Sequence, residues 1–357
     1  MLAVLLRLGL AHPWVIVSLN MLFLSFGLYA AYCLLNAEFF ADRTVAIMIC
    51  CLFLLSYVVV KHSTMPLTEG PFFMCSMSCL LFMSKAADVA SNRYFVVLVG
   101  AALLSAAAAI TIRRIGIAFV PPLAITLLRS RQFQSLWKRL ASRSKAVVLM
   151  VSGVVAVAAV GAFVFTSNWR VFISDAKARY RIVPLSLLPW YRLKELGELF
   201  VNFPANRMPV AVQGVVPWLG VPLFLLLVAG LAARRKSVSS TDVFLVCYAI
   251  ILFAWPYYDA RFWWPVIPLL VAYSLLAVQR FKIPPAVVAA YCVWFAILGF
   301  GVIAYSTRIT FSGCGFPDRY GSGDLAPTYR AAFEWCREDA EPGKVNPRVL
   351  RLLREYQ

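Results

Sequence analysis

The chain has 357 residues, of which 62% are hydrophobic and 14% are charged, and its mean hydropathy is +0.79. Soluble domains average about 25% charged residues, so the composition excludes a soluble protein and predicts an all-α polytopic membrane protein. The formal net charge of +18 fits loops that face anionic lipid and the cytoplasm. No basic stretch belongs to a soluble domain, so membrane lipids are expected partners and nucleic acid is not.

Ten apolar segments follow one another along the chain. A helix needs about 20 apolar residues to cross the hydrocarbon core, and most of the segments meet this length if they tilt. The run 115–128 is short and contains Pro121 and Pro122, which favours a re-entrant or half-helix. We therefore expect about ten transmembrane or re-entrant helices in one membrane domain, residues 1–306. The segments cover about 14–35, 44–60, 66–84, 94–112, 115–128, 146–167, 213–233, 243–258, 262–279 and 283–306.

The distribution of Lys and Arg predicts the orientation. The connection 129–145 carries six of them, and the connections 234–236 and 280–282 carry five more. If the ten segments alternate, all three connections fall on one side, and an excess of Lys and Arg in short loops marks the cytoplasmic side. Both chain ends then lie on the extracytoplasmic side of the cell membrane (inner or plasma membrane).

Two extracytoplasmic regions are expected. Within the loop 168–212, the stretch WYRLKELGELFVNF (190–203) has apolar residues at helical spacing with charged residues between them. An amphipathic helix on the membrane surface and a loop helix that caps the bundle both fit. Residues 307–357 hold seven of the sixteen acidic residues and form a small C-terminal tail. A disulfide between Cys314 and Cys336 and two free thiols both remain open there.

Five charged residues at the edges of apolar segments map to the same, outer side of the membrane. A charge at membrane depth costs several kcal/mol, and such charges tend to mark sites of chemistry or ion binding. Their shared side predicts one functional site. The five are Glu69, Arg113, Arg114, Asp259 and Arg261.

Glu69 has two interpretations. It follows Pro66 by three residues, so it can sit in the first turn of a helix, where the helix dipole favours an anion. Alternatively it is a base, a ligand for a divalent metal ion, or an anchor for a cation of the substrate. The sequence alone leaves both open.

The arginines also have two interpretations. Arg113 and Arg114 can reach lipid headgroups, or they can clamp a phosphate, whose oxygens match the guanidinium fork. Asp259 and Arg261 can form a local ion pair. Alternatively Arg261 binds a phosphate while Tyr257, Tyr258 and other aromatic residues of this interfacial belt stack on an isoprenoid or a sugar.

Four stretches together resemble a known family. They are HSTMPLTEGPFF (62–73), AAAITIRRIGIAFVPPLAITLL (107–128), ELFVNF (198–203) and YYDARFWWPVIPLL (257–270). In order, spacing and common side they resemble GT-C-type integral membrane glycosyltransferases, the protein-mannosyltransferase and aminoarabinose-transferase superfamily. The resemblance covers about residues 3 to 340.

The resemblance implies a GT-C-like helical bundle with an extracytoplasmic active side. The donor would be a polyprenyl-phosphate sugar, and the acceptor a lipid, a glycan or a protein. Glu69 or Asp259 would act as the base, with Glu69 also available to a divalent metal ion. The remaining residues that it implies for the substrate and its phosphate are Arg113, Arg114, Arg261, Tyr257, Tyr258 and Asn202.

The chain departs from the family pattern at its start. Family members carry an acidic motif in a first outer loop, but residues 1–37 contain no Asp or Glu. A shortened chain, a non-catalytic relative and a site completed by another chain all fit this departure. A lipid-linked sugar flippase or transporter is the second functional class, and it should carry charges near the midplane and at both gates.

Overall fold

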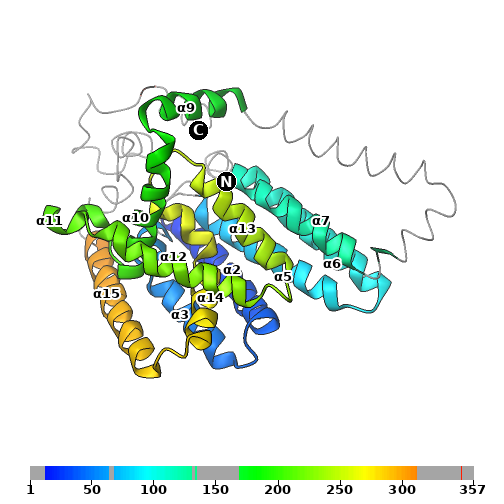
Figure 1. Cartoon of the computed structure of the whole chain (residues 1–357). Coiled ribbons are helices and arrows are strands. Elements are labelled where there is room, and N and C mark those ends of the chain that lie inside the picture. The colour runs from blue at the N-terminus through cyan, green and yellow to red at the C-terminus, as the bar shows by residue number, and fades with distance from the viewer. Residues whose placement is uncertain (1–12, 64–67, 131–132, 135–168, 312–346, 348–357) are drawn as a thin grey trace.

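The computed structural model describes residues 13–63, 68–130, 133–134, 169–311 and 347, and every regular element among them is a helix (Figure 1). The all-α class is therefore confirmed for this part of the chain. The predicted segment 146–167, nearly all of the acidic tail, and both Cys314 and Cys336 lie outside the described residues.

The helices follow the apolar segments closely. The longer ones are α2 (Pro13–Glu38), α5 (Glu69–Asp88), α6 (Asn92–Ile112), α12 (Val216–Ala233) and α15 (Pro285–Phe311). Between them lie α3 (Arg43–Leu55), α4 (Tyr57–Ser63), α7 (Val120–Arg129), α9 (Trp169–Ile182), α10 (Leu188–Val201), α11 (Val210–Gln213), α13 (Ser240–Phe253) and α14 (Ile267–Arg280). The described residues also contain four 3₁₀ turns: η1 (Arg114–Phe119), η2 (Leu185–Leu187), η3 (Ala205–Arg207) and η4 (Ala260–Val266).

Six of the described helices are long and apolar enough to cross a membrane, or seven if α3 and α4 form one span bent by 60°. The protein is therefore an integral membrane protein with several spans by length and composition, while the described residues do not reach the expected ten. Two of the expected segments correspond to α7 and α13, which have only 10 and 14 residues, and a third, 146–167, lies outside the described residues. In α7, Pro121 and Pro122 occupy the first turn, as expected for a helix that starts within the bundle.

Close approach of helix backbones holds α10, α12 and α14 together. A Cβ atom added to Gly197 of α10 would lie 1.9 Å from the Val216 carbonyl oxygen. A Cβ atom added to Gly220 of α12 would lie 1.9 Å from the Leu193 carbonyl oxygen. A Cβ atom on Gly230 would lie 2.1 Å from the Tyr273 carbonyl oxygen of α14. Small residues permit such contacts between helices in lipid, so α10 is fixed directly on a membrane helix.

The environment of α10 decides between its two interpretations. Leu196 and Leu199 are buried, but so are Arg192, Glu195 and Glu198. An amphipathic helix on the membrane surface would expose its charged face, so that interpretation is wrong for α10. The helix caps the bundle and turns its polar side inward.

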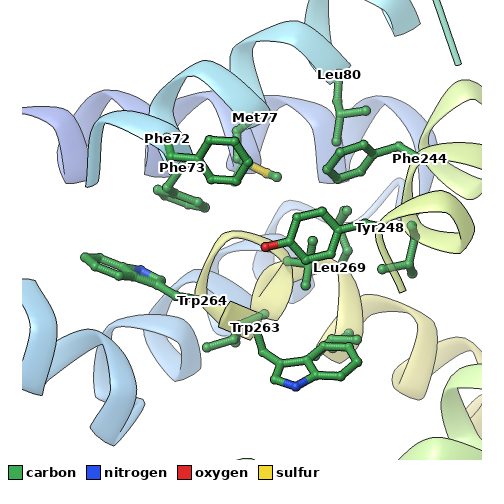
Figure 2. Packing of buried hydrophobic residues seen from close by; sticks show 14 of the residues in the cluster. Phe72, Phe73, Met77, Leu80, Phe244, Tyr248, Trp263, Trp264 and Leu269 are labelled. Carbon is green, nitrogen blue, oxygen red and sulfur yellow. The ribbon is translucent and has the colours of Figure 1, made fainter. Parts of the chain in front are cut away.

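An aromatic core joins α5, α13 and η4 (Figure 2). Phe72 and Met77 of α5 face Tyr248 of α13, and the two indole rings of η4, Trp263 and Trp264, lie on the other side of Tyr248. All five are at most 1% exposed. This rigid layer lies next to the first turn of α5 and so supports the charged residues found there.

Side-chain contacts define two ends of the bundle. At the Glu69 end, ion pairs connect Glu69 to Arg113 and Arg261. At the Glu38 end, Arg234 pairs with Glu38 and Asp242. The first set of contacts brings together the start of α5, the end of α6 and η4, as the alternation of segments predicts.

Candidate functional site

Glu69 is the centre of the charged cluster. It opens α5, where the positive end of the helix dipole favours a carboxylate, and it is only 2% exposed. Its Oε1 lies 2.9 Å from Arg113 Nη1 and 3.8 Å from Arg261 Nε. Its Oε2 is buried and has no hydrogen-bond partner among the described residues. One oxygen is therefore held by cations while the other is left to accept a proton or a hydroxyl group.

Arg113 and Arg261 share an aromatic support. Arg113 ends α6 in an extended conformation, and its guanidinium carbon lies 5.8 Å from the Phe72 ring centre and 5.3 Å from that of Phe262. The guanidinium carbon of Arg261 lies 5.5 Å from the same Phe262 ring. Cation–π contacts of this kind hold both guanidinium groups in place. Arg114 follows as the first residue of η1, with a half-buried side chain.

Asp259 completes a row of alternating charges. Its Oδ2 lies 2.9 Å from Arg261 Nε, and its Oδ1 accepts the Arg261 backbone N–H at 2.9 Å as the N-cap of η4. The predicted local ion pair is thus present, and Glu69 joins it to Arg113. Asp259 and Arg261 are each about one-third exposed, at 34% and 33%. They form the accessible half of the row, and Glu69 with Arg113 forms the buried half.

A buried polar network on α10 supports this row. Arg192 Nη1 and Glu195 Oε2 lie 2.9 Å apart, and neither side chain has any exposed surface. Glu195 also accepts hydrogen bonds of 2.7 Å from the Asp259 backbone N–H and from the Trp263 indole. Arg192 donates to the Tyr257 carbonyl oxygen. Through its hydrogen bonds to Tyr257, Asp259 and Trp263, the pair therefore holds the segment that carries Asp259 and Arg261.

Burial acts against both charges of this pair. Burial raises the pKa of Glu195 to about 8, although Arg192 and the two hydrogen bonds from Asp259 and Trp263 act against this rise. Burial likewise lowers the pKa of Arg192, against the attraction of Glu195. Two ions that are both removed from water are costly unless each compensates the other, so each residue depends on the other to stay charged.

The two tyrosines of the predicted site, Tyr257 and Tyr258, contact different partners. The Tyr258 hydroxyl donates to Glu198 Oε1, and its ring carries Lys194 Nζ 5.0 Å from the centre. Burial and the Glu198 carboxylate raise the pKa of Tyr258, so its hydroxyl stays protonated and remains a donor. Tyr257 instead lies under Arg179 of α9, whose guanidinium carbon is 5.3 Å from the ring centre.

More positive charge gathers at this end. Lys61, near the end of α4, interacts electrostatically with Asp259, Arg261, Glu198 and Arg207. Lys61 is half-buried and Arg207 is exposed. The Glu69 end thus offers cations to an anionic group from three separate parts of the chain.

Asn202 lies apart from the charged row. It is fully buried and ends α10 in the left-handed conformation, with φ 60°, which Asn tolerates. Its Oδ1 accepts the Tyr57 N–H at 2.7 Å, and its Nδ2 donates to the carbonyl oxygens of Leu55 and Phe295 at 3.0 and 3.1 Å. Leu55 and Tyr57 flank the break at Ser56, so Asn202 satisfies backbone groups that the bent pair α3–α4 leaves free.

Replacing Asn202 with alanine is expected to destabilise the protein by about 2–3 kcal/mol, because backbone groups on two sides of a helix break lose buried partners. Thermal unfolding of the purified protein in detergent measures this. A variant that unfolds like the parent but binds a polyprenyl phosphate more weakly would instead assign Asn202 to substrate binding, as the resemblance implies.

The residues around Glu69 do not fit a divalent metal ion. The charged groups nearest to its Oε1 are the guanidinium groups of Arg113 and Arg261, which repel a cation. Among the described residues, no three His, Cys, Asp or Glu side chains come together in a way that could hold a metal.

Comparison with known proteins finds no match: no protein-family model, no curated protein and no solved structure matches the chain.

Proposed function

We propose that the protein transfers a sugar from a polyprenyl-phosphate donor to an acceptor at the Glu69 end of the bundle. The observation that carries the proposal is the row Arg113–Glu69–Arg261–Asp259, in which a buried carboxylate with an unpartnered oxygen stands between two arginines. A base and cations for a leaving phosphate are the groups that such a transfer needs. The resemblance of the four sequence stretches to GT-C-type enzymes supports the same reaction.

The chemistry assigns a role to each group. The acceptor oxygen attacks the anomeric carbon of the sugar, and the bond from that carbon to the phosphate oxygen breaks. The acceptor proton passes to a carboxylate, for which Glu69 Oε2 is the buried candidate and Asp259 the exposed one. The electron pair leaves with polyprenyl phosphate, whose new negative charge is stabilised by Arg261 and Arg113. General base catalysis of this kind contributes about 10²–10⁴-fold to the rate.

A membrane transporter for a lipid-linked sugar is the second candidate. The observation that favours it is the cluster at the Glu38 end, where Arg234 Nε lies 3.0 Å from Asp242 Oδ1 and Arg234 Nη2 lies 3.4 Å from Glu38 Oε2. Charges at both ends are expected of a carrier with two gates. In the Glu38 cluster both carboxylates pair with Arg234, whereas in the Glu69 cluster one carboxylate oxygen has no hydrogen-bond partner among the described residues, which favours the transferase.

One experiment separates the two candidates. Purified protein receives a polyprenyl-phosphate sugar labelled in the sugar, together with lipid, glycan or protein acceptors, and release of polyprenyl phosphate is followed. The transferase releases polyprenyl phosphate and labels an acceptor. Translocation of intact donor across proteoliposomes without release would instead support the transporter.

Replacing Arg261 with alanine is expected to weaken donor binding about 10-fold or more, because a hydrogen bond to a charged group contributes about 1.5–3 kcal/mol. Binding of the labelled donor to the variant in detergent measures this. The matched control is Arg280→Ala, which removes an exposed arginine at the far end of α14. Equal binding by both variants would remove Arg261 from the phosphate site.

A further inference from the structure

A cavity of about 200 Å³ with both polar and apolar lining residues lies at the Glu38 end, away from the proposed transfer site. It is formed where α2 and α5 end, α7 ends and α13 begins, so four helices contribute to its wall. Five hydroxyl groups line it, from Ser84, Thr126, Ser130, Ser239 and Ser240. Its charged residues are Glu38, Asp88 and Arg129.

Of the three charged residues that line the cavity, one anion and one cation remain available to bind a ligand. Glu38 is already compensated, because Arg234 pairs with its carboxylate and also donates to its carbonyl oxygen at 2.7 Å. Asp88 and Arg129 are exposed and have no ion-pair partner among the described residues. Arg129 is oriented by a 2.6 Å hydrogen bond to the Val238 carbonyl oxygen. The cavity thus has one carboxylate and one guanidinium that form no ion pair with the described part of the chain.

The position of the cavity restricts what can reach it. Asp88 ends a candidate membrane span, Glu69–Asp88, and Arg129 ends the short apolar helix α7. Ends of spanning helices lie at the depth of the lipid headgroups. The distribution of Lys and Arg predicts that this is the cytoplasmic side.

We propose that the cavity binds an ethanolamine phosphate group. The primary ammonium contacts Asp88 and the hydroxyl groups of the wall, and the phosphate contacts Arg129. The ammonium supplies three donors to a wall that is rich in oxygen acceptors. A guanidinium suits the phosphate. A choline headgroup has no N–H donor, and a glycerol phosphate headgroup brings no cation for Asp88, so both fit less well. The group can come from a phospholipid or from a soluble ester.

Native mass spectrometry of the full chain released from detergent tests the proposal. The probes are phosphatidylethanolamine, phosphatidylcholine and phosphatidylglycerol of the same acyl chains, and free glycerophosphoethanolamine. We expect the ethanolamine lipid to be retained about fivefold over the other two lipids. Asp88→Asn should remove this preference. Arg129→Gln should weaken retention of all three lipids, because each carries a phosphate, while Arg280→Gln, which replaces an exposed arginine outside the cavity, should change neither.

Each outcome decides the proposal. One outcome is that glycerophosphoethanolamine binds although no lipid is preferred over the others. If that binding is lost in the Asp88→Asn variant, the result supports the headgroup chemistry and assigns it to a soluble ester. Equal retention of the three lipids with no effect of the free ester overturns the proposal. A preference that survives Asp88→Asn, or lipid retention that is unchanged in Arg129→Gln, overturns it as well, because the binding site would then lie elsewhere.

Discussion

Replacing Arg192 with glutamine is expected to destabilise the protein by about 3–5 kcal/mol, the usual cost of breaking a buried ion pair by removing one partner. Arg192 and Glu195 are both fully buried at 2.9 Å. Without the guanidinium, the Glu195 carboxylate stays buried with only the Asp259 N–H and the Trp263 indole as donors. Unfolding of the purified protein by heat or by denaturing detergent measures the loss.

Two controls make this result specific. The double variant Arg192→Gln with Glu195→Gln removes both charges, and it should recover a large part of the lost stability because no uncompensated ion remains. Arg207→Gln removes an exposed arginine at the same end and should change stability by less than about 1 kcal/mol. If the single and double variants were equally unstable, the pair would act through shape and not through charge.

Replacing Glu69 with glutamine is expected to lower the rate of sugar transfer by about 10²–10⁴-fold, the usual contribution of a general base. Glutamine keeps the size of the side chain and can still accept the hydrogen bond from Arg113, so the arginines stay near their positions. The variant loses only the ability to take a proton. Release of polyprenyl phosphate at saturating donor measures this, with donor binding expected to change by less than about threefold.

The control for Glu69→Gln is Asp42→Asn. Asp42 caps α3 with a 2.8 Å hydrogen bond from the Thr44 N–H and is exposed, and Asn caps helices as well as Asp does. This carboxylate-to-amide change far from Glu69 should leave the transfer rate unchanged. A Glu69→Gln variant that turns over at the parent rate would move the role of base to Asp259.

The sequence predicts the parts of the fold that depend on local hydrophobicity. Nine of the ten predicted segments coincide with described helices, because an apolar run of membrane length forms a helix whatever its neighbours are. Alternation of these segments also predicts that Glu69, Arg113 and Arg261 lie together. What hydrophobicity does not determine is whether a short helix such as α7 or α13 crosses the membrane, since that depends on its surroundings.

The support for the site could not be predicted in the same way. Helical spacing shows that α10 has two faces, but a polar face that binds water and one that pairs internally have the same pattern. Polar residues recur every three or four positions along α10, and this spacing was the signal available in the sequence. They are Arg192, Glu195, Glu198 and Asn202. Its partners Tyr57, Asp259 and Trp263 lie more than 60 residues away in sequence, so only the tertiary structure joins them.

The cluster at the Glu38 end shows the same limit. Glu38, Arg234 and Asp242 belong to three separate loops or helix ends, and each alone is typical of a charged residue at the edge of a span. Arg234 pairs with Asp242 only eight positions away, but its contacts with Glu38 span 196 positions of sequence. The sequence therefore predicted a cluster of paired charges on the outer side only, whereas the described residues form an ion-pair cluster at each end.

The most direct test of the central claim is to map where a polyprenyl phosphate binds. A polyprenyl-phosphate analogue with a photoreactive group next to the phosphate is cross-linked to the purified protein, and the labelled peptides are identified by mass spectrometry. The account predicts labels close to Arg113 and Arg261, in residues 111–115 and 257–263, and their loss when unlabelled polyprenyl phosphate competes. Competable labels confined to the Glu38 end, in residues 37–40 or 234–242, would contradict it.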